Sequence, residues 1–413
     1  MPLLIGFALN AQSVMTAKVD DPNAVYFAAP EFTIHGDGKT DDSAAIQAAI
    51  DKAEVNHQGI VFIPSGQYAV ARTVYVKAGI RLFGYGATRP AFVLPENSPG
   101  FQKGMGVLFM FIGARPGGAY DPGARVPVPP PGTVPPKEVP DANSGTFYSA
   151  MSNIDVEIGD GNPAAVCVRF HVAQHAFLTH MNFRIGSGLA GIYQVGNEAE
   201  DLHFFGGRYG ILTEKTSPAW QFTLIDSSFE GQRDAAIREH EAGLTLIRDS
   251  FRNVPVGVDI DREYYDQLWA KDCRFSDVSR AAIVISSEKS RLNEIGIESA
   301  VLSNVPVFAL YRESGKKLTA KGSVYRVDEF NHGVVVPAPG SMGEIGTTYK
   351  AESLTAAPPP LTPAIRPMPG CEEWLNVKTL GVAGDGKTDD TAALQKAIDG
   401  HRVLYLPSGH YLV

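Results

Sequence analysis

Carboxylates gather in two neighbouring stretches near the middle of this 413-residue chain. If the two stretches lie on adjacent turns of a repeat, their carboxylates stand ~5 Å apart. Like charges that close raise the pKa of one carboxyl group, so one residue could act as an acid and another as a base. The same residues could equally form a solvated face of an acidic protein. They are Glu239 and Glu241 in the first stretch and Asp259, Asp261 and Glu263 in the second.

Aromatic side chains near these acids suggest contacts with sugar rings. Trp269 follows two tyrosines, Tyr264 and Tyr265, directly after the second acidic stretch, and Trp220 precedes the first. We interpret the two tryptophans and the two glutamates of the first stretch as candidate substrate-binding residues. The alternative is that they are isolated surface aromatics, which are normal in proteins.

A unit that reads Gly-Asp-Gly-Lys-Thr-Asp-Asp occurs at residues 36–42 and again at 384–390. Thirteen of the 16 positions from Gly36 to Asp51 are identical in the second copy. Each unit leads into an amphipathic helical pattern, then into a short apolar run that ends in Pro-Ser-Gly. We expect its Thr and Asp oxygens to cap the helix and the helix to cover the end of a solenoid.

Two catalytic or binding interpretations of this unit fail. Residues 381–388 match the phosphate-binding loop pattern, but Thr33 stands where the first copy needs its first glycine. A calcium loop of the EF-hand type needs Glu at the twelfth position, which Ala48 occupies. The unit is therefore predicted to be structural, and we expect no metal and no cofactor.

A repeat of 22 to 24 residues runs through the middle of the chain, marked by Phe183, Phe205, Phe229, Phe251 and Phe275. Between these aromatics a small residue followed by an aliphatic one recurs, as in Gly-Ile, Ala-Ile and Gly-Val. Two interleaved columns of short strands at this period predict an all-β solenoid, with apolar ladders inside and exposed faces outside.

The chain divides by composition into four parts. Residues 1–29 are a leader, interpreted either as a clipped signal peptide or as a mis-started or disordered segment. Residues 30–350 are the solenoid domain, with a Pro-rich insertion at 115–145. A Pro-rich linker at 351–373 then leads to residues 374–413, expected to be the truncated start of a second module. The leader suggests a secreted or periplasmic protein.

Charge and cysteine content narrow the classes of partner. The formal net charge of −9 disfavours nucleic acid and, less strongly, polyanionic glycans. The three cysteines, far apart and odd in number, predict buried small residues rather than disulfides or metal ligands. No apolar run is long enough to span a membrane. We expect a monomer whose partner is a polysaccharide.

The duplicated unit and its Ala-Ala-Ile-Gln-Ala-Ala-Ile helix resemble the opening of the pectate-lyase-like superfamily of right-handed parallel β-helices. Two tandem copies joined by a Pro-rich linker resemble, more narrowly, glycoside hydrolase family 55. Three further runs add to this resemblance: Arg169-Phe-His-Val-Ala-Gln174, Gly191-Ile-Tyr193 and Phe205-Gly-Gly-Arg-Tyr-Gly210. It implies a right-handed parallel β-helix with a short N-terminal capping helix, plus the start of a second β-helix.

The resemblance also implies an activity and site residues. Family 55 enzymes are exo-acting, inverting β-1,3-glucanases, which need an acid and a base-activated water. By resemblance the general acid lies beyond Val413, Gln174 holds the attacking water, Tyr193 contacts sugar, and Glu198 loosely matches a small polar position. Gln174 and Glu198 are therefore the candidate catalytic residues. Gln174 could instead belong to an amide ladder inside the solenoid.

Two other functions remain open, because the opening motif is shared by proteins with different chemistry. One is a polysaccharide lyase or epimerase on the same fold, for which calcium ligands and a basic groove would be expected. The other is a non-catalytic, glycan-binding or structural β-helix.

Overall fold

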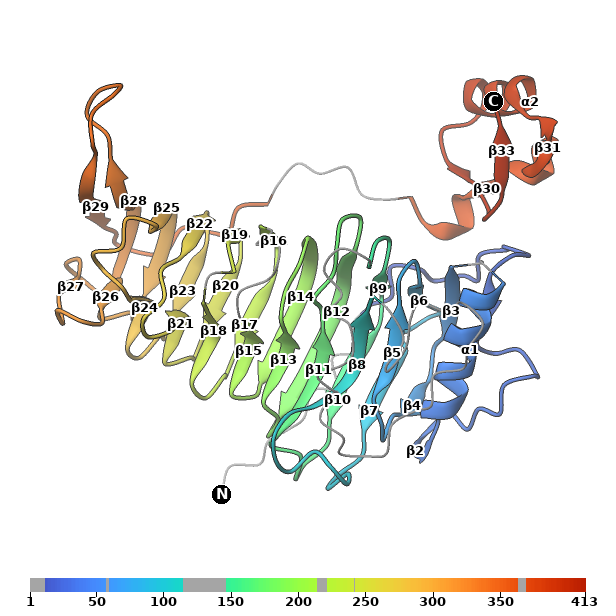
Figure 1. Cartoon of the computed structure of the whole chain (residues 1–413), viewed down its shortest axis with the longest axis horizontal. Coiled ribbons are helices and arrows are strands. Elements are labelled where there is room, and N and C mark those ends of the chain that lie inside the picture. The colour runs from blue at the N-terminus through green and yellow to red at the C-terminus, as the bar shows by residue number, and fades with distance from the viewer. Residues whose placement is uncertain (1–11, 57–58, 114–145, 214–220, 241, 363–368) are drawn as a thin grey trace.

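The computed structural model describes residues 12–56, 59–113, 146–213, 221–240, 242–362 and 369–413. The chain winds into a parallel β-solenoid whose strands stack along one long axis (Figure 1). The described residues contain two α-helices, α1 (Ser43–Val55) and α2 (Thr391–Gly400). The predicted fold class is confirmed. Residues 1–11 of the predicted leader and the whole Pro-rich insertion lie outside the described residues, whereas the rest of the predicted leader is described and includes strand β1.

One face of the solenoid is a ten-stranded sheet. Its strands pair in parallel except for the last, which pairs antiparallel. In spatial order they are β5 (Val74–Lys77), β8 (Gly106–Ile112), β11 (Ala165–Arg169), β13 (Ala190–Tyr193), β15 (Tyr209–Leu212), β18 (Ala235–Glu239), β21 (Val256–Ile260), β24 (Ala281–Ile285), β26 (Ala309–Tyr311) and β27 (Lys317–Leu318).

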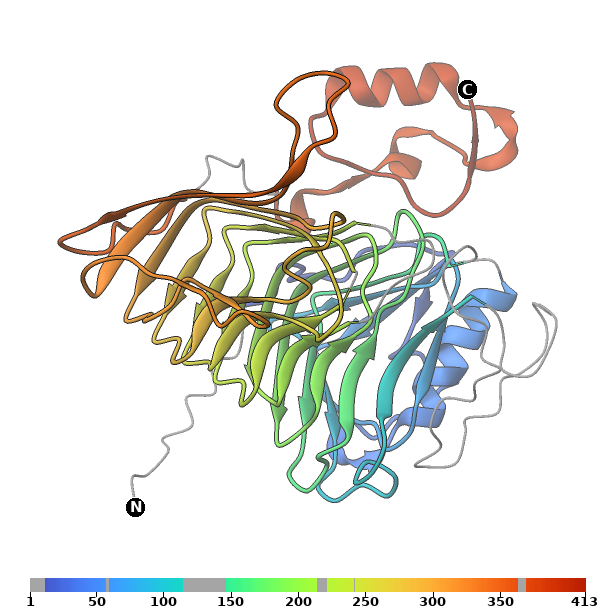
Figure 2. The same cartoon turned by 60° about the vertical axis from the view of Figure 1, so that its left-hand side comes forward.

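The remaining strands of the solenoid form a nineteen-stranded sheet. The antiparallel hairpin β28–β29 closes it at the end far from α1 (Figure 2). In chain order its strands are β1 (Val25–Tyr26), β2 (Asp37–Asp41), β3 (Ile60–Pro64), β4 (Gln67–Ala69), β6 (Arg81–Tyr85), β7 (Ala91–Leu94), β9 (Ala150–Ser152), β10 (Asp155–Ile158), β12 (Phe177–Gly186), β14 (Glu198–Gly206), β16 (Phe222–Ile225), β17 (Ser228–Glu230), β19 (Leu244–Ile247), β20 (Ser250–Arg252), β22 (Gln267–Lys271), β23 (Arg274–Ser276), β25 (Glu294–Ser303), β28 (Val324–Val335) and β29 (Glu344–Ser353).

A ladder of five stacked phenylalanines fills the core between the sheets. Neighbouring ring centroids are 4.6 to 5.1 Å apart and the ring planes are within 8° of parallel. The sequence repeat predicted this ladder with one error: its second member is Phe204, because Phe205 points outward and is half-buried beside Arg184. The members are Phe183, Phe204, Phe229, Phe251 and Phe275.

The column of small residues in the sequence repeat is explained by this ladder. A Cβ atom added to Gly210 would lie 2.4 Å from the ring of Phe229, and one added to Gly191 would lie 2.7 Å from the ring of Phe204. Larger residues at these positions of the ten-stranded sheet would collide with the rings. The aromatic and small columns are therefore one packing unit.

We predict that Phe204→Ala lowers the free energy of unfolding by about 3–5 kcal/mol, because it removes a fully buried ring from the middle of the ladder. Phe205→Ala, next to it but outside the core, should cost about 1 kcal/mol or less. The measurement is denaturant unfolding of both variants. Equal losses would contradict the ladder.

The solenoid begins with the duplicated unit, and both copies fold alike. In the first, β1 pairs with β3 and β2 with β4, all in parallel. In the second, β30 (Leu375–Asn376) pairs with β32 (Leu404–Tyr405) and β31 (Asp385–Asp389) with β33 (His410–Leu412), also in parallel. Helix α1 buries its predicted stripe of Ile46, Ala49, Ile50 and Ala53. None of the described helices is long and apolar enough to cross a membrane.

The last aspartate of each unit closes a loop rather than capping the helix, so the predicted capping role is partly wrong. The Asp42 carboxylate accepts hydrogen bonds from the backbone N–H groups of His35 and Gly36, at 2.8 and 3.0 Å. Asp390 does the same in the second copy. Only the preceding aspartate reaches the helix, where Asp41 accepts from the N–H of Ser43 at 3.0 Å.

The second copy packs against the start of the solenoid. The buried Asp21 carboxylate accepts hydrogen bonds from the Tyr405 hydroxyl and the Ser408 N–H group, both at 2.9 Å. Cys371 is buried beside Thr16 and Ala17, and Cys167 and Cys273 are also buried and free, as predicted. Residues far apart in the sequence thus share one interface.

Candidate functional site

A cavity of about 740 Å³ opens on the outer face of the ten-stranded sheet, beside the second acidic stretch of the sequence. Strands β15, β18 and β21 and the turns around them supply most of its lining. It is lined by Tyr209, Asp234, Arg238, His240, Asp259, Asp261, Arg262, Tyr264, Arg280 and Arg312. We call this cavity the acidic–arginine groove.

Ion pairs fix the carboxylates of the groove. Arg238 Nε donates to Asp261 Oδ1 at 2.8 Å, and Arg312 forms an ion pair with Asp259. The hydroxyl of Tyr209 accepts a hydrogen bond from Arg238 at 3.1 Å. His240 lies parallel to the ring of Tyr264, with centroids 3.9 Å apart, and its Nδ1 is 3.4 Å from Asp261. The polar groups are therefore held in place before any ligand arrives.

The two aspartates on β21 and just after it differ in environment. Asp259 lies on β21 and Asp261 directly follows Ile260, the last residue of that strand, and both side chains line the groove. Burial raises the pKa of Asp259, and the opposing effect of Arg312 does not cancel it. Asp259 is thus suited to hold a proton.

A single lateral row of the sheet links the groove to a residue predicted from sequence. Parallel pairing joins Tyr193 to Leu212, Leu212 to Arg238 and Arg238 to Asp259. Tyr193 therefore lies three strands, or ~14 Å, along the same face from Asp259. A chain lying along the solenoid axis would pass both residues.

Gln174 lies in the turn that follows β11, and its side chain is exposed. The alternative of an amide ladder inside the solenoid is therefore wrong. Its backbone carbonyl accepts a hydrogen bond from Tyr148 at 3.3 Å, and the next residue, His175, stacks on the Tyr148 ring. The side chain is available to solvent on the edge of the solenoid.

Glu239 does not face the groove, although the sequence placed it on an outward turn. Its side chain is fully buried, as is that of Asp266. Burial, followed by the charge of Asp266, raises the pKa of Glu239 well above its ordinary value. One oxygen on each carboxyl group is buried without a hydrogen-bond partner among the described residues, an arrangement suited to a proton shared by the pair.

We predict that Glu239→Gln gains stability relative to the native chain as the pH rises. Because the pKa of Glu239 is raised in the folded state, this carboxyl group contributes most to the free energy of unfolding below its unfolded pKa of ~4.3. Above that pH the contribution falls, by at most ~1.4 kcal/mol per pH unit. The neutral amide has no such loss. Unfolding measured from acid to neutral pH checks this; a constant difference would contradict it, and Glu263→Gln at an exposed position is the control.

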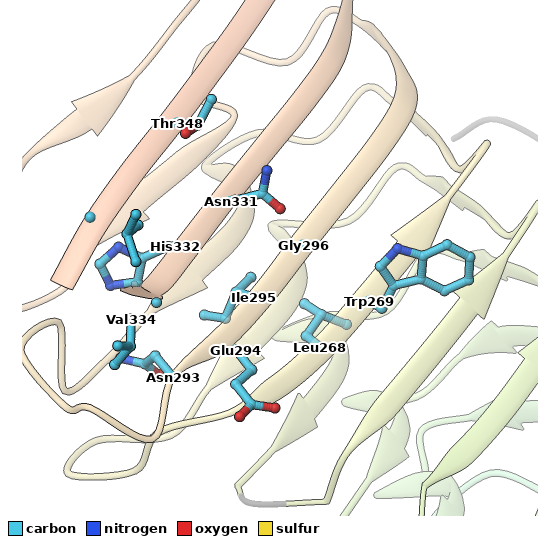
Figure 3. Close-up of a pocket in the computed structure, with 13 residues that line it drawn as sticks. Leu268, Trp269, Asn293, Glu294, Ile295, Gly296, Asn331, His332, Val334 and Thr348 are labelled. Carbon is cyan, nitrogen blue, oxygen red and sulfur yellow. The ribbon is translucent and has the colours of Figure 1, made fainter. Parts of the chain in front are cut away.

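Two other predicted residues lie on the nineteen-stranded sheet. Pairing joins Glu198 to Thr223, Thr223 to Thr245 and Thr245 to Trp269, so the two share an outer row away from the groove. Trp269 lines a second cavity of about 360 Å³, shown in Figure 3. Trp220 and Glu241 lie outside the described residues.

Several groove residues were missed in the sequence. Arg312 lies 53 positions from its partner Asp259, and Tyr209 comes from a strand two turns earlier, so neither forms a local motif with the acids. Arg312 and Tyr209 could have been predicted only from the strand register of the repeat, which brings them to the groove. Among the described residues, no group of three or more His, Cys, Asp or Glu side chains is placed to hold a metal ion.

Both copies of the duplicated unit match a known protein family. A family model described as rhamnogalacturonase A/epimerase, pectate lyase-like, matches residues 26–110 and 374–413. Mannuronan C5-epimerase AlgE3 of Azotobacter vinelandii is 32% identical over 110 residues, covering 24% of this chain and 6% of its own. A probable glucan endo-1,3-beta-glucosidase of Arthroderma benhamiae is 37% identical over 82 residues, covering 16% of this chain and 9% of its own.

Among solved structures, the catalytic unit of an α-1,3-glucanase of family GH87 from Streptomyces thermodiastaticus aligns with a TM-score of 0.42 and 12% identity, covering 74% of this chain and 51% of that one. The chain spans less than a tenth of the length of the two relatives above. Taken together, the sequence matches support the pectate-lyase-like superfamily of β-helix proteins and do not single out glycoside hydrolase family 55.

Proposed function

We propose that this chain carries the catalytic groove of an inverting glycoside hydrolase that acts on an extracellular polysaccharide. The observation that carries the proposal is the pair Asp259 and Asp261, each held by an arginine inside the acidic–arginine groove. Inverting enzymes use two carboxyl groups ~6.5–9.5 Å apart, which leaves room for a water molecule between them, and two carboxylates in one groove could supply such a pair. Relatives whose names denote polysaccharide-modifying enzymes add support.

The two aspartates take different roles in this proposal. Asp259, with its raised pKa, donates a proton to the glycosidic oxygen as the bond to the anomeric carbon breaks. Asp261, anchored by Arg238, removes a proton from the water that attacks that carbon from the opposite face. The overall change adds one water across the glycosidic bond.

The other residues bind and orient the sugar chain. Tyr193 on the same row offers a contact ~14 Å from the acid, and Tyr264 stacked on His240 walls one side of the groove. Gln174 in its exposed turn offers an amide to a further sugar or to water. The duplicated unit keeps the structural role described above.

β-1,3-Glucan, cleaved in exo mode, is the substrate we propose first. The groove is lined by four arginines and three aspartates, so its formal charge is nearly balanced and suits an uncharged sugar chain. The partial identity to a probable glucan endo-1,3-beta-glucosidase points to the same linkage.

An acidic polysaccharide processed by a lyase or epimerase is the second candidate. Arg262 and Arg280 line the groove and have no ion-pair or hydrogen-bond partner for their side chains among the described residues, so they could neutralise a uronate carboxylate. The net charge of the whole chain disfavours acidic substrates. Salt screens charges more than ~10 Å away, so the arginines that line the groove affect a bound sugar chain more than distant surface acids do.

We predict that Asp259→Asn and Asp261→Asn each reduce kcat on the preferred polysaccharide by about 10²–10⁴-fold, the usual contribution of a general acid or base. Asp328→Asn, on β28 and half-exposed, is the control and should keep full activity. Product release by the three variants decides the matter. Retained activity in both groove variants would place the acid and base elsewhere, as the family 55 resemblance implies.

We also predict that kcat falls as the pH rises through the pKa of Asp259, because the acid must be protonated to act. Its raised pKa moves this limb to higher pH than for an ordinary aspartate. The measurement is the hydrolysis rate on laminarin and on polygalacturonate at a series of pH values, which gives both the pH dependence of kcat and the preferred substrate. Release of an unsaturated product from polygalacturonate, with laminarin untouched, would select the lyase instead.

A further inference from the structure

The second cavity, at the far end of the nineteen-stranded sheet, has the composition of a sugar site. A single lateral row crosses it from Trp269 through Gly296 and Asn331 to Thr348, one residue from each of β22, β25, β28 and β29. Figure 3 shows these four residues in line along the cavity. The row is ~14 Å long at the strand spacing of a sheet.

The glycine in this row leaves a trough beside the indole. A Cβ atom added to Gly296 would lie 3.3 Å from Trp269 Cδ1 and 3.4 Å from the amide oxygen of Asn331. The indole N–H donates to Glu298 at 3.4 Å, which turns the ring's polar edge to the side of the row. A flat ligand lying over Gly296 would therefore contact the indole on one side and the amide oxygen on the other.

Polar groups with free hydrogen-bonding capacity face the trough. The side-chain amide of Asn331 donates to Glu329 at 3.0 Å, which leaves its oxygen as an acceptor without a described partner. Glu294 is exposed at the edge and accepts from Gln267 at 3.3 Å. An aromatic face combined with a few placed amide, hydroxyl and carboxylate groups is how sites for polar ring compounds are built.

The charge of the cavity selects among glycans. Among the described residues that line the cavity, Glu294 is the only one with a charged side chain, because burial lowers the pKa of His332 and favours its neutral form. Glu298 and Glu329 flank the row, each paired with a lysine. No cation lines the cavity to neutralise a uronate or sulfate group, so an uncharged sugar chain fits it best.

We propose that this cavity is a second glycan-binding site, separate from the catalytic groove, which holds an uncharged polysaccharide chain by stacking a sugar ring on Trp269 over Gly296. It lies on a different sheet from strand β21, which carries Asp259. The site would keep the enzyme on its polymer between cleavage events. The inference adds a binding function to the one proposed above and does not depend on which residues are catalytic.

The test is binding of laminarin, an uncharged glucan, to the 413-residue chain carrying Asp259→Asn, which limits turnover during the measurement. We expect Trp269→Ala in this background to weaken the affinity about tenfold, which is ~1.4 kcal/mol. Gly296→Val should weaken it similarly by filling the trough, and a strand position tolerates valine. Thr245→Ala, one strand away on the same row but outside the cavity, should bind as the parent chain does.

Polygalacturonate is the charged comparison, and Trp269→Ala should leave its binding unchanged. The proposal is overturned if the parent chain does not bind laminarin, if Trp269→Ala and Gly296→Val bind it as tightly as the parent chain, or if Trp269→Ala weakens polygalacturonate binding equally. Unchanged thermal unfolding of each variant ensures that affinity, not folding, is compared. Because binding is measured, the answer is independent of whether Asp259→Asn abolishes turnover.

Discussion

The stacking of phenylalanine rings against a column of small residues is the constraint on which the solenoid depends. Rings spaced 4.6 to 5.1 Å apart match the spacing of neighbouring strands, so each turn must register with the next. A shift of one residue would turn every side chain to the other face and remove the rings from their close packing against Gly191 and Gly210. The outer rows inherit this register, which is why residues far apart in the sequence share one groove.

The repeat in the sequence predicts this architecture because its period records the packing directly. The error at Phe205 has a physical cause. Adjacent residues of a strand point to opposite faces, so either Phe204 or Phe205 could enter the core, and the pairing with neighbouring strands determines which one does. The capping expectation failed for a related reason. Asp42 stands between the tight loop before it and the first turn of the helix after it. The N–H groups of the loop donate to both of its carboxylate oxygens, so neither oxygen caps the helix.

The candidate site was predictable only in part. The two acidic stretches indicated the right turns, and Asp259 and Asp261 line the groove. Glu239 turns inward, because residues alternate between faces along β18, and it becomes a buried partner of Asp266. Arg312 and Tyr209 reach the groove through register alone. The solenoid thus separates an arginine-lined groove on one sheet from a tryptophan-lined trough on the other, and the charges that line them differ.

The central proposal is that Asp259 and Asp261 act as acid and base in a hydrolysis that inverts the anomeric carbon. The most direct test is the anomeric configuration of the first sugar released, followed by proton NMR before mutarotation. The account predicts a product of configuration opposite to the bond cleaved, so a β-linked glucan gives the α-anomer first. Release of the β-anomer would mean a covalent intermediate and a retaining mechanism, and would contradict it.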